Sequence, residues 1–227
     1  MLTQYNPKVF SNLNEFDISR KRLEEEQAKI PHLGDVICRH NLHRHVGISL
    51  LHKHFEMSDD EMLVERFIGE RSFAVPLSES ESIRAVPYMW KAVKHSESES
   101  WVFYPLEFVE CPDDKLFETV TQNEVFFADM ANVLSNLGVT DVFGVSVLHR
   151  EAIRLTEDHT ILENSNGRER RLNFQGVSKE KLSTELDLTR TLWAFNSSDG
   201  YTCNRHDDCS GHGCAHCEGH AVCQGIH

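Results

Sequence analysis

The chain has 227 residues, of which 40% are hydrophobic and 26% are charged, a composition typical of one large globular domain. Its 36 acidic and 23 basic residues give a formal net charge of −13, which would repel a phosphate backbone, so we expect no nucleic-acid partner. Because the chain lacks both a run of ~18 apolar residues and the basic and apolar blocks of a secretory signal, we expect no membrane partner and a cytoplasmic location.

The first segment, residues 1–33, contains a highly charged stretch that favours a helix. Residues 17–30, DISRKRLEEEQAKI, have only a narrow apolar face. Asp17 can cap this helix, and Pro31 is expected to stop it. We therefore expect a charged N-terminal helix at the surface of the protein.

Between residues 34 and 109 the sequence changes to short β-rich runs, separated by polar, Pro-containing or Gly-containing stretches. Such runs are typical of an antiparallel meander or barrel. The expected strands are DVIC (35–38), VGISLLHKHF (46–55), EMLVERFI (61–68), RSFAVPL (71–77), IRAVPYMWKAV (83–93) and WVFYPLEFVE (101–110).

One helix and three further β regions follow. Residues 115–137 place most of their apolar side chains on one face, with Asp113 or Asp114 as N-cap and Gly138 as terminator, so we expect one helix packed on the sheet. The remaining β regions are DVFGVSVLHR (141–150), a hairpin around Asn166-Gly167, and LDLTRTLWAF (186–195).

Together these elements predict an α+β fold. Its main part is an antiparallel β meander or small barrel over residues 34–195, with one packed helix, the charged N-terminal helix and an irregular Cys/His-rich tail. We divide the chain into the helical segment 1–33, a β-rich core domain 34–197 and a metal-binding tail 198–227, because large apolar residues become rare after the polar linker SSDGY.

Two His-x-His pairs lie close together in the stretch LHRHVGISLLHKHF, residues 42–55. Because side chains alternate along a strand, His52 and His54 would share a face with Ile48 and Leu50, which makes it the core face. Burial disfavours the protonated imidazole, and the neutral ring is the form that binds metal. The pattern therefore predicts a metal site at His52 and His54.

His43 and His45 are further candidate ligands. Their odd offset from the second pair turns them to the opposite face of an unbroken strand, but a bend or bulge at Gly47 would bring both pairs to one centre. A lone histidine on an apolar face is more often a hydrogen-bonded core residue, whereas two such pairs in one short stretch are rarer by chance.

The string HKHFEMSDDEMLVERFIG resembles the first motif of cupin barrels over some 20 residues, with Glu61 and Gly69 in the places of the acidic residue and the glycine. The resemblance implies a small β-barrel that holds iron, manganese, copper or nickel, and His149 from a distant strand would close the site. The spacers are longer than in the family, and its Gly-Pro-Gly-His motif has no counterpart here. Glu61 is the candidate acid/base group; SDDE also fits a helix start, and His149 also fits a solvent-facing strand end.

The tail, residues 201–227, combines five cysteines and five histidines with almost no large apolar side chains. Hydrophobic burial cannot order such a segment, so we predict that it folds around zinc or copper. The candidate ligands are Cys203, His206, Cys209, Cys214, His216, Cys217 and Cys223. Disulfide pairing of the tail and a redox pair at Cys214 and Cys217 are the alternatives.

Three functional interpretations follow, each with a transition metal ion (copper, iron or zinc) as cofactor. The His cluster favours an intracellular metal-dependent oxidoreductase that uses copper or non-haem iron on a small-molecule substrate. The tail favours a copper or zinc chaperone or store that exchanges ions with a metal donor or acceptor protein. The third interpretation is an interaction domain with a structural zinc tail. No string typical of serine hydrolases, P-loop proteins or dinucleotide-binding proteins is present.

Overall fold

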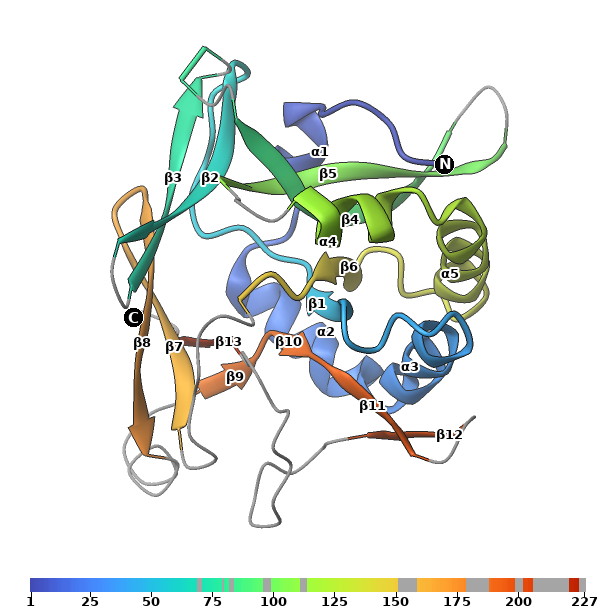
Figure 1. The fold of residues 1–227 in the computed structure, drawn as a ribbon. Coiled ribbons are helices and arrows are strands. Elements are labelled where there is room, and N and C mark those ends of the chain that lie inside the picture. The colour runs from blue at the N-terminus through green and yellow to red at the C-terminus, as the bar shows by residue number, and fades with distance from the viewer. Residues whose placement is uncertain are drawn as a thin grey trace.

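The fold is seen in a computed structural model (Figure 1), which describes residues 1–68, 71–78, 80–81, 84–95, 99–110, 114–150, 159–178, 188–198, 202–205 and 221–224. It is a mixed α/β fold with one curled sheet in which antiparallel pairing dominates. In Figure 1 helices α3 and α5 lie on the right, and two β-hairpins, β2–β3 and β7–β8, lie on the left.

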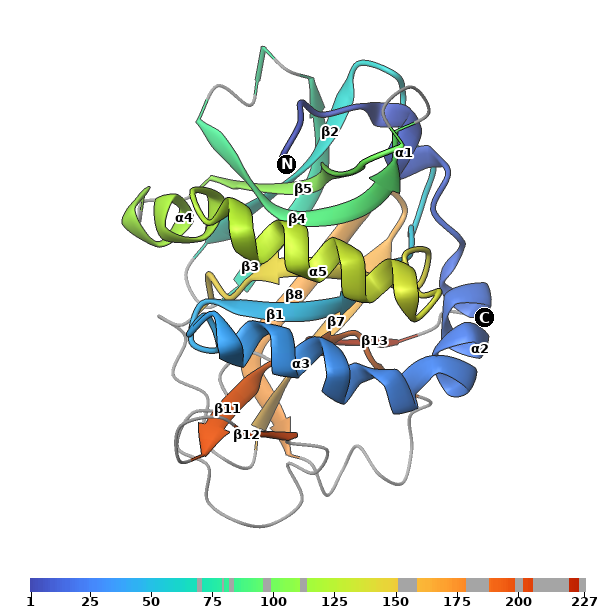
Figure 2. The ribbon, with the colours of Figure 1, turned by 90° about the vertical axis from the view of Figure 1, so that its right-hand side faces the viewer.

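The helical elements are α1 (Pro7–Ser11), α2 (Phe16–Glu26), the 3-10 turn η1 (Gln27–Lys29), α3 (Ile30–Arg39), α4 (Asp114–Thr121) and α5 (Glu124–Asn136). Helices α3 and α5 pack against each other and run along the same side of the sheet (Figure 2). In α3 the buried residues Ile30, Leu33 and Ile37 recur every three or four positions, so this short helix buries one apolar face.

The main sheet contains eleven described strands in the order β10-β1-β6-β4-β5-β2-β3-β8-β7-β13-β9. A second sheet pairs β11 with β12. The bounds are β1 (Val46–Leu50), β2 (Glu61–Ile68), β3 (Arg71–Ser78), β4 (Ala85–Lys94), β5 (Trp101–Glu110), β6 (Phe143–Val147), β7 (His159–Asn166), β8 (Glu169–Ser178), β9 (Leu188–Arg190), β10 (Leu192–Trp193), β11 (Phe195–Ser198), β12 (Thr202–Arg205) and β13 (Ala221–Gln224). Because β1 and β6 are neighbours, the strand order is not that of a meander, which is one of the two arrangements that the sequence predicts.

The N-terminal helices correct two of the predictions. The stretch expected as one helix, 17–30, is divided between α2, η1 and the start of α3. Pro31 lies in the first turn of α3, where a missing N–H costs nothing, so it helps to begin a helix and does not stop one. The expected strand 35–38 is also wrong, because these residues belong to α3, which continues to Arg39.

Three other boundaries also differ from the predictions. The helix expected over 115–137 is two helices, because the Asn123 side chain caps a new helix by accepting from the Phe126 N–H at 3.0 Å. The strand expected over 46–55 ends at Leu50. The last strand, 186–195, is interrupted into β9, β10 and β11. The hairpin is confirmed: Asn166 pairs with Glu169, and Gly167 takes a φ of 62° in the turn.

The order of elements repeats along the chain. A helix, a strand and a hairpin occur as α3, β1 and β2–β3, and again as α5, β6 and β7–β8. The second helix–strand unit follows the first by 97 residues, the separation of Ser49 from Ser146. With this offset, the end of α3 corresponds to the end of α5, and Val46 at the start of β1 corresponds to Phe143 at the start of β6.

The backbone hydrogen bonds of the two units match at this offset. Asn41 and Gly138, which follow α3 and α5, both take a positive φ, 56° and 69°. The matching N–H to C=O bonds are Leu42→Ile37 and Val139→Leu134, His45→Leu42 and Val142→Val139, Val46→Leu42 and Phe143→Val139, and Leu51→Val142 and Leu148→His45. The last pair of bonds crosses between the units in both directions, which is what an approximate two-fold axis requires.

This axis passes between Ile48 and Val145, which pair directly in the antiparallel β1–β6 contact. On its two sides β4 pairs with β6, and β10 pairs with β1. A Cβ on Gly47 would lie 2.7 Å from the carbonyl oxygen of Trp193 in β10, and a Cβ on Gly144 would lie 2.6 Å from that of Trp90 in β4. The described body therefore consists of two similar units whose strands pair with each other across the axis.

Candidate metal centre

His52 and His54 lie immediately after β1, where the chain leaves its pairing with β6. The Lys53 N–H donates to the Asn14 carbonyl at 2.9 Å, and the Ser19 hydroxyl donates to the Leu51 carbonyl at 2.7 Å, so the segment is held against the start of α2. The ring of Phe16 lies 5.2 Å from the His52 ring. These contacts fix a short non-strand segment that turns both imidazoles to the same place.

The two rings meet a carboxylate from the distant strand β7. The Nε2 atoms of His52 and His54 are 3.0 Å apart, and Nε2 of His54 lies 2.7 Å from Oε1 of Glu163. Nδ1 of His54 lies 2.9 Å from the Ser165 hydroxyl. Within the described residues, His52, His54 and Glu163 form the group whose ligand atoms lie close enough together, within 4.8 Å, to hold one metal ion.

The His52 tautomer is the one that metal binding requires. Its Nδ1 lies 2.9 Å from the Leu50 carbonyl, which can only accept, so Nδ1 carries the hydrogen. Burial, followed by the neighbouring His54, lowers the pKa of His52 to about 4, so the ring is neutral near pH 7. Its Nε2 therefore points a lone pair at His54 and Glu163.

Glu163 is buried and ionised. Burial alone would raise the pKa of this carboxyl, but the Arg170 guanidinium and the hydrogen bond from His54 outweigh burial and hold the pKa well below its usual value. The hydrogen on Nε2 of His54 consequently faces two acceptors, the Glu163 oxygen and the His52 lone pair. A metal ion in place of this hydrogen would be bound by three atoms at once: Nε2 of His52, Nε2 of His54 and the Glu163 oxygen.

The spacing of the three atoms is close to that of a coordinated set. Ligand atoms about 2.1 Å from an ion at tetrahedral angles lie about 3.4 Å from one another. The observed separations of 3.0 and 2.7 Å are shorter, so an ion would require the ligands to move apart by about half an ångström.

A second buried network supports the carboxylate. Arg170 on β8 lies 3.6 Å from Glu163 through Nε, and its Nη1 donates to Glu107 at 2.7 Å, with a second short contact to the same carboxylate. The Tyr88 hydroxyl accepts from Arg170 at 2.8 Å and donates to Glu107. Because these groups are buried and mutually bonded, they fix Arg170, and Arg170 in turn holds Glu163 in its ionised form.

His149 occupies the equivalent position in the second unit. It is the second residue after β6, as His52 is the second after β1, and its Nδ1 donates to the Val147 carbonyl at 3.1 Å. Its Nε2 lies 3.0 Å from Oε2 of Glu65, the fifth residue of β2. Glu163 is the fifth residue of β7, so each of these histidines lies close to a glutamate from the other unit.

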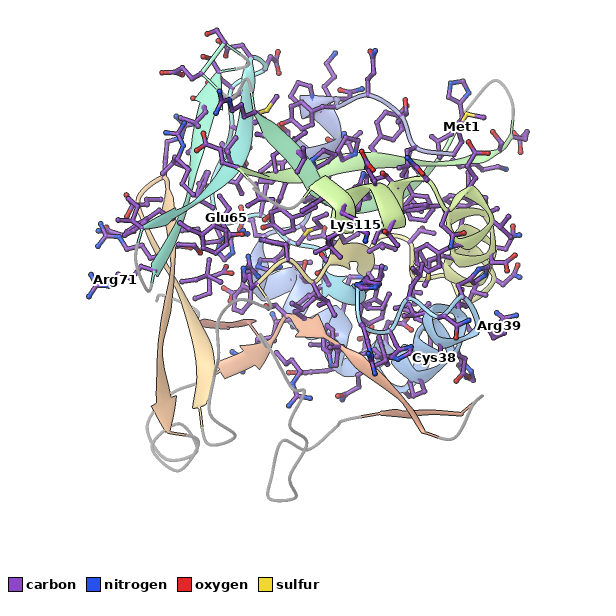
Figure 3. All side chains as sticks on the ribbon, viewed as in Figure 1. Met1, Cys38, Arg39, Glu65, Arg71 and Lys115 are labelled. Carbon is purple, nitrogen blue, oxygen red and sulfur yellow. The ribbon has the colours of Figure 1, made fainter. Side chains whose placement is uncertain are left out.

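At this second centre an arginine binds the carboxylate together with the histidine. Arg150 donates to both Glu65 oxygens at 3.0 and 2.6 Å, and Ser72 donates to Oε1 at 2.5 Å. Burial would raise the pKa of Glu65, but Arg150 and His149 hold the pKa well below its usual value. Both ring nitrogens of His149 already have partners, the Val147 carbonyl and the Glu65 carboxylate, and that carboxylate is shared with Arg150 and Ser72. Figure 3 shows Glu65 on the side of the hairpins.

The other predicted site residues lie elsewhere. His43 and His45, in the turn before β1, do not join the group of His52, His54 and Glu163, and burial lowers the pKa of His43. Glu61 accepts from the Ser58 N–H at 2.8 Å and forms an exposed ion pair with Arg168. Gly69 lies outside the described residues.

The tail ligands remain predictions. Cys203 lies in β12 and Cys223 in β13, and β13 pairs with β7 and β9. Outside the described residues lie His206, Cys209, Cys214, His216 and Cys217. Cys38 on α3, labelled in Figure 3, is disulfide-bonded.

The sequence reasoning missed the carboxylates and the arginines. Glu65 and Glu107 interrupt the apolar runs EMLVERFI and WVFYPLEFVE, and an acidic residue at a core position requires a buried partner. A repeat was also missed: Gly-x-Ser-x-x-His occurs at residues 47–52 and again at 144–149. Nothing local marks Glu163 as a ligand, since its role depends on where β7 lies.

Comparison of the chain with protein-family models, with curated proteins and with solved structures finds no match. No described helix is both long and apolar enough to cross a bilayer. The functional interpretation therefore rests on the geometry of the centre.

Proposed function

We propose that this protein is a metal-dependent oxidoreductase that acts on a small molecule, with a divalent transition metal ion held by His52, His54 and Glu163. The proposal depends on one observation. Ligand atoms of His52, His54 and Glu163 lie within 4.8 Å of one another, around the hydrogen on Nε2 of His54. Two histidines and one carboxylate are typical of non-haem Fe(II) oxygenases, so iron is the favoured ion and copper the less favoured one.

The arrangement supports catalysis better than storage. Three protein ligands leave coordination positions open for a substrate or a water molecule, whereas a structural or storage site is usually closed by four. A small cavity of about 30 Å³ is lined by His52, Glu163 and Arg170, so there is space beside two of the three ligands. The bound ion would supply Lewis-acid or redox chemistry.

The residues around the ligands have positioning roles. The Leu50 carbonyl fixes the His52 tautomer, and the Ser165 hydroxyl orients the His54 ring. Arg170 keeps Glu163 ionised and is itself anchored by Glu107. Such partners of metal ligands typically change metal affinity or activity 10–100-fold when they are removed.

A catalytic zinc centre is the second candidate, because two histidines and a glutamate also form catalytic zinc sites. The zinc or copper chaperone and the interaction domain with a zinc tail depend on tail residues 206–220, which lie outside the described residues. Metal analysis separates these alternatives.

The test is the metal content of the purified full chain after loading with Fe(II), Zn(II) or Cu(II) and removal of unbound ion. His52→Gln, His54→Gln and Glu163→Gln keep hydrogen-bonding capacity but remove a ligand, so each is expected to lose one tightly bound ion per chain. The matched control is His149→Gln at the equivalent position, whose amide can still donate to Glu65; it is expected to keep that ion.

Replacement of the five tail cysteines by serine provides the second control. One ion that survives this replacement but not His54→Gln supports the proposal. If His52→Gln, His54→Gln and Glu163→Gln all bind the same amount of each metal as the parent, the proposal is refuted.

A further inference from the structure

The small cavity beside the candidate metal centre lies around the approximate two-fold axis. Its lining includes residues that occupy equivalent positions in the two units: Ser49 with Ser146, Leu50 with Val147, and Met89 with Leu192. The hydroxyls of Ser49 and Ser146 lie 2.5 Å apart. The polar lining also includes residues of both centres and their surroundings: His52 and Glu163 at the candidate metal centre, Arg150 at the equivalent centre, and Tyr88, Arg170 and Thr191.

Nε of Arg170 has no hydrogen-bond acceptor among the residues that the structure describes. Its Nη1 and Nη2 donate to Glu107 and Tyr88, whereas Nε is buried and finds no hydrogen-bond acceptor among the described residues. The nearest charged atom is Oε1 of Glu163, at 3.6 Å, beyond hydrogen-bond length. A buried N–H of a guanidinium without an acceptor is costly, and here it belongs to a residue that lines the cavity.

The charges around the cavity favour a negative ligand once a metal is present. The three carboxylates of Glu65, Glu107 and Glu163 face the two guanidinium groups of Arg150 and Arg170, so these groups together carry one more negative charge than positive charges. A divalent ion would add two positive charges in a buried place, and an anion beside it would offset part of that excess.

The size of the cavity limits the ligand. A water molecule needs roughly 10–15 Å³ measured in this way, so about 30 Å³ holds two or three heavy atoms. This volume favours such a ligand over a larger organic molecule.

We propose that this cavity binds a small monoanion of two or three heavy atoms, with one end on the metal ion held by His52, His54 and Glu163 and the other end accepting from Nε of Arg170. The proposal rests on the proposed function, because it requires the metal. It adds that the substrate or co-substrate that reaches the metal is a small anion, such as a carboxylate or peroxide anion of this size, and that Arg170 selects it.

The experiment uses the full chain loaded with Co(II), whose visible absorption reports on its ligands, and azide as the probe. Azide is expected to change the Co(II) spectrum saturably, and formate is expected to compete with it. Benzoate, which has nine heavy atoms, is expected neither to change the spectrum nor to compete. This comparison needs no variant and therefore does not depend on any substitution folding.

Arg170→Lys tests the role of Nε, since it keeps a cation beside Glu107 but loses the Nε–H group. Azide affinity is expected to fall about tenfold or more, because a hydrogen bond to a charged group is lost. The matched control is Arg168→Lys, two residues earlier on the same hairpin and exposed, and it is expected to leave azide affinity unchanged. Circular dichroism and cobalt content establish that each variant is folded and loaded.

The outcomes are separable. If the parent binds no cobalt, the proposed function fails and this inference fails with it. If cobalt binds but azide leaves its spectrum unchanged, or benzoate binds as well as azide, the metal centre stands and the small-anion site is refuted. Equal azide affinity in the parent and in a folded, cobalt-loaded Arg170→Lys variant also overturns the inference.

Discussion

The two equivalent glycines provide a direct test of the two-fold arrangement. Gly47 and Gly144 lie on β1 and β6, and alanine at either position would place a methyl group against the backbone of a neighbouring strand. The new Cβ would lie 2.7 Å from the Trp193 carbonyl oxygen in the first case and 2.6 Å from the Trp90 carbonyl oxygen in the second. We predict that Gly47→Ala and Gly144→Ala destabilise the protein by similar amounts.

The magnitude follows from the shift that each methyl group requires. A carbon and an oxygen need roughly 3.4 Å, so β10 must move by about 0.7 Å and β4 by about 0.8 Å. Overpacking of this kind costs about 1–3 kcal/mol, and the smaller conformational freedom of unfolded alanine offsets about 0.4–1 kcal/mol of that. We therefore expect each substitution to lower the free energy of unfolding by about 1–2 kcal/mol.

The assay is urea unfolding followed by circular dichroism, in which the midpoint falls while the slope stays the same. Ser49→Ala is the control, because it places alanine on the same buried strand without adding an atom and reports the loss of the serine hydroxyl alone. If either glycine variant is as stable as the parent, or if one loses stability and the other gains it, the two-fold packing described here is wrong.

Three further predictions concern the buried polar groups. Fe(II) or Zn(II) at 100 times its dissociation constant should stabilise the parent by about 2.7 kcal/mol in thermal unfolding but leave His54→Gln unchanged; equal shifts would contradict the proposed ligands. The pKa values of Glu65 and Glu163 are lower in the folded protein than in the unfolded chain. The stability that these carboxylates contribute is therefore fully present above the unfolded pKa, and it is lost as the pH falls through the pKa values of the folded protein. Urea midpoints should therefore drop below about pH 4.5, and a midpoint that rises on acidification would contradict this. Tyr88→Phe removes a hydroxyl that bonds Glu107 and should cost about 1–3 kcal/mol by urea unfolding, whereas no loss would show that the hydroxyl is not needed.

Several local features could be read from the sequence because they depend on residues close together in the chain. Strands such as 61–68 and 101–110 follow from their apolar, β-branched and aromatic content, and the hairpin follows from Asn166-Gly167, where a turn requires a positive φ. The His-x-His spacing at residues 52–54 indicated that two imidazoles would lie together, and the structure places their Nε2 atoms 3.0 Å apart.

Where a residue fits two local structures equally well, the prediction from sequence was wrong. Pro31 is compatible with both the end of one helix and the first turn of the next, and only the burial of the α3 face against β1 and α5 decides between them. The repeat LHRHV and LHKHF is conspicuous in the sequence, yet the repeat with structural meaning is Gly-x-Ser-x-x-His at residues 47–52 and 144–149.

The sequence by itself determined where strands and helices could form and that His52 and His54 would be neighbours. Only the tertiary structure decided which carboxylate they meet, because Glu163 reaches them through the antiparallel β7–β8 hairpin. It also decided that the equivalent His149 meets Glu65, a carboxylate that Arg150 binds as well. The physical reason is that alternation and helical periodicity act over a few residues, whereas a metal centre depends on the register of strands far apart in the chain.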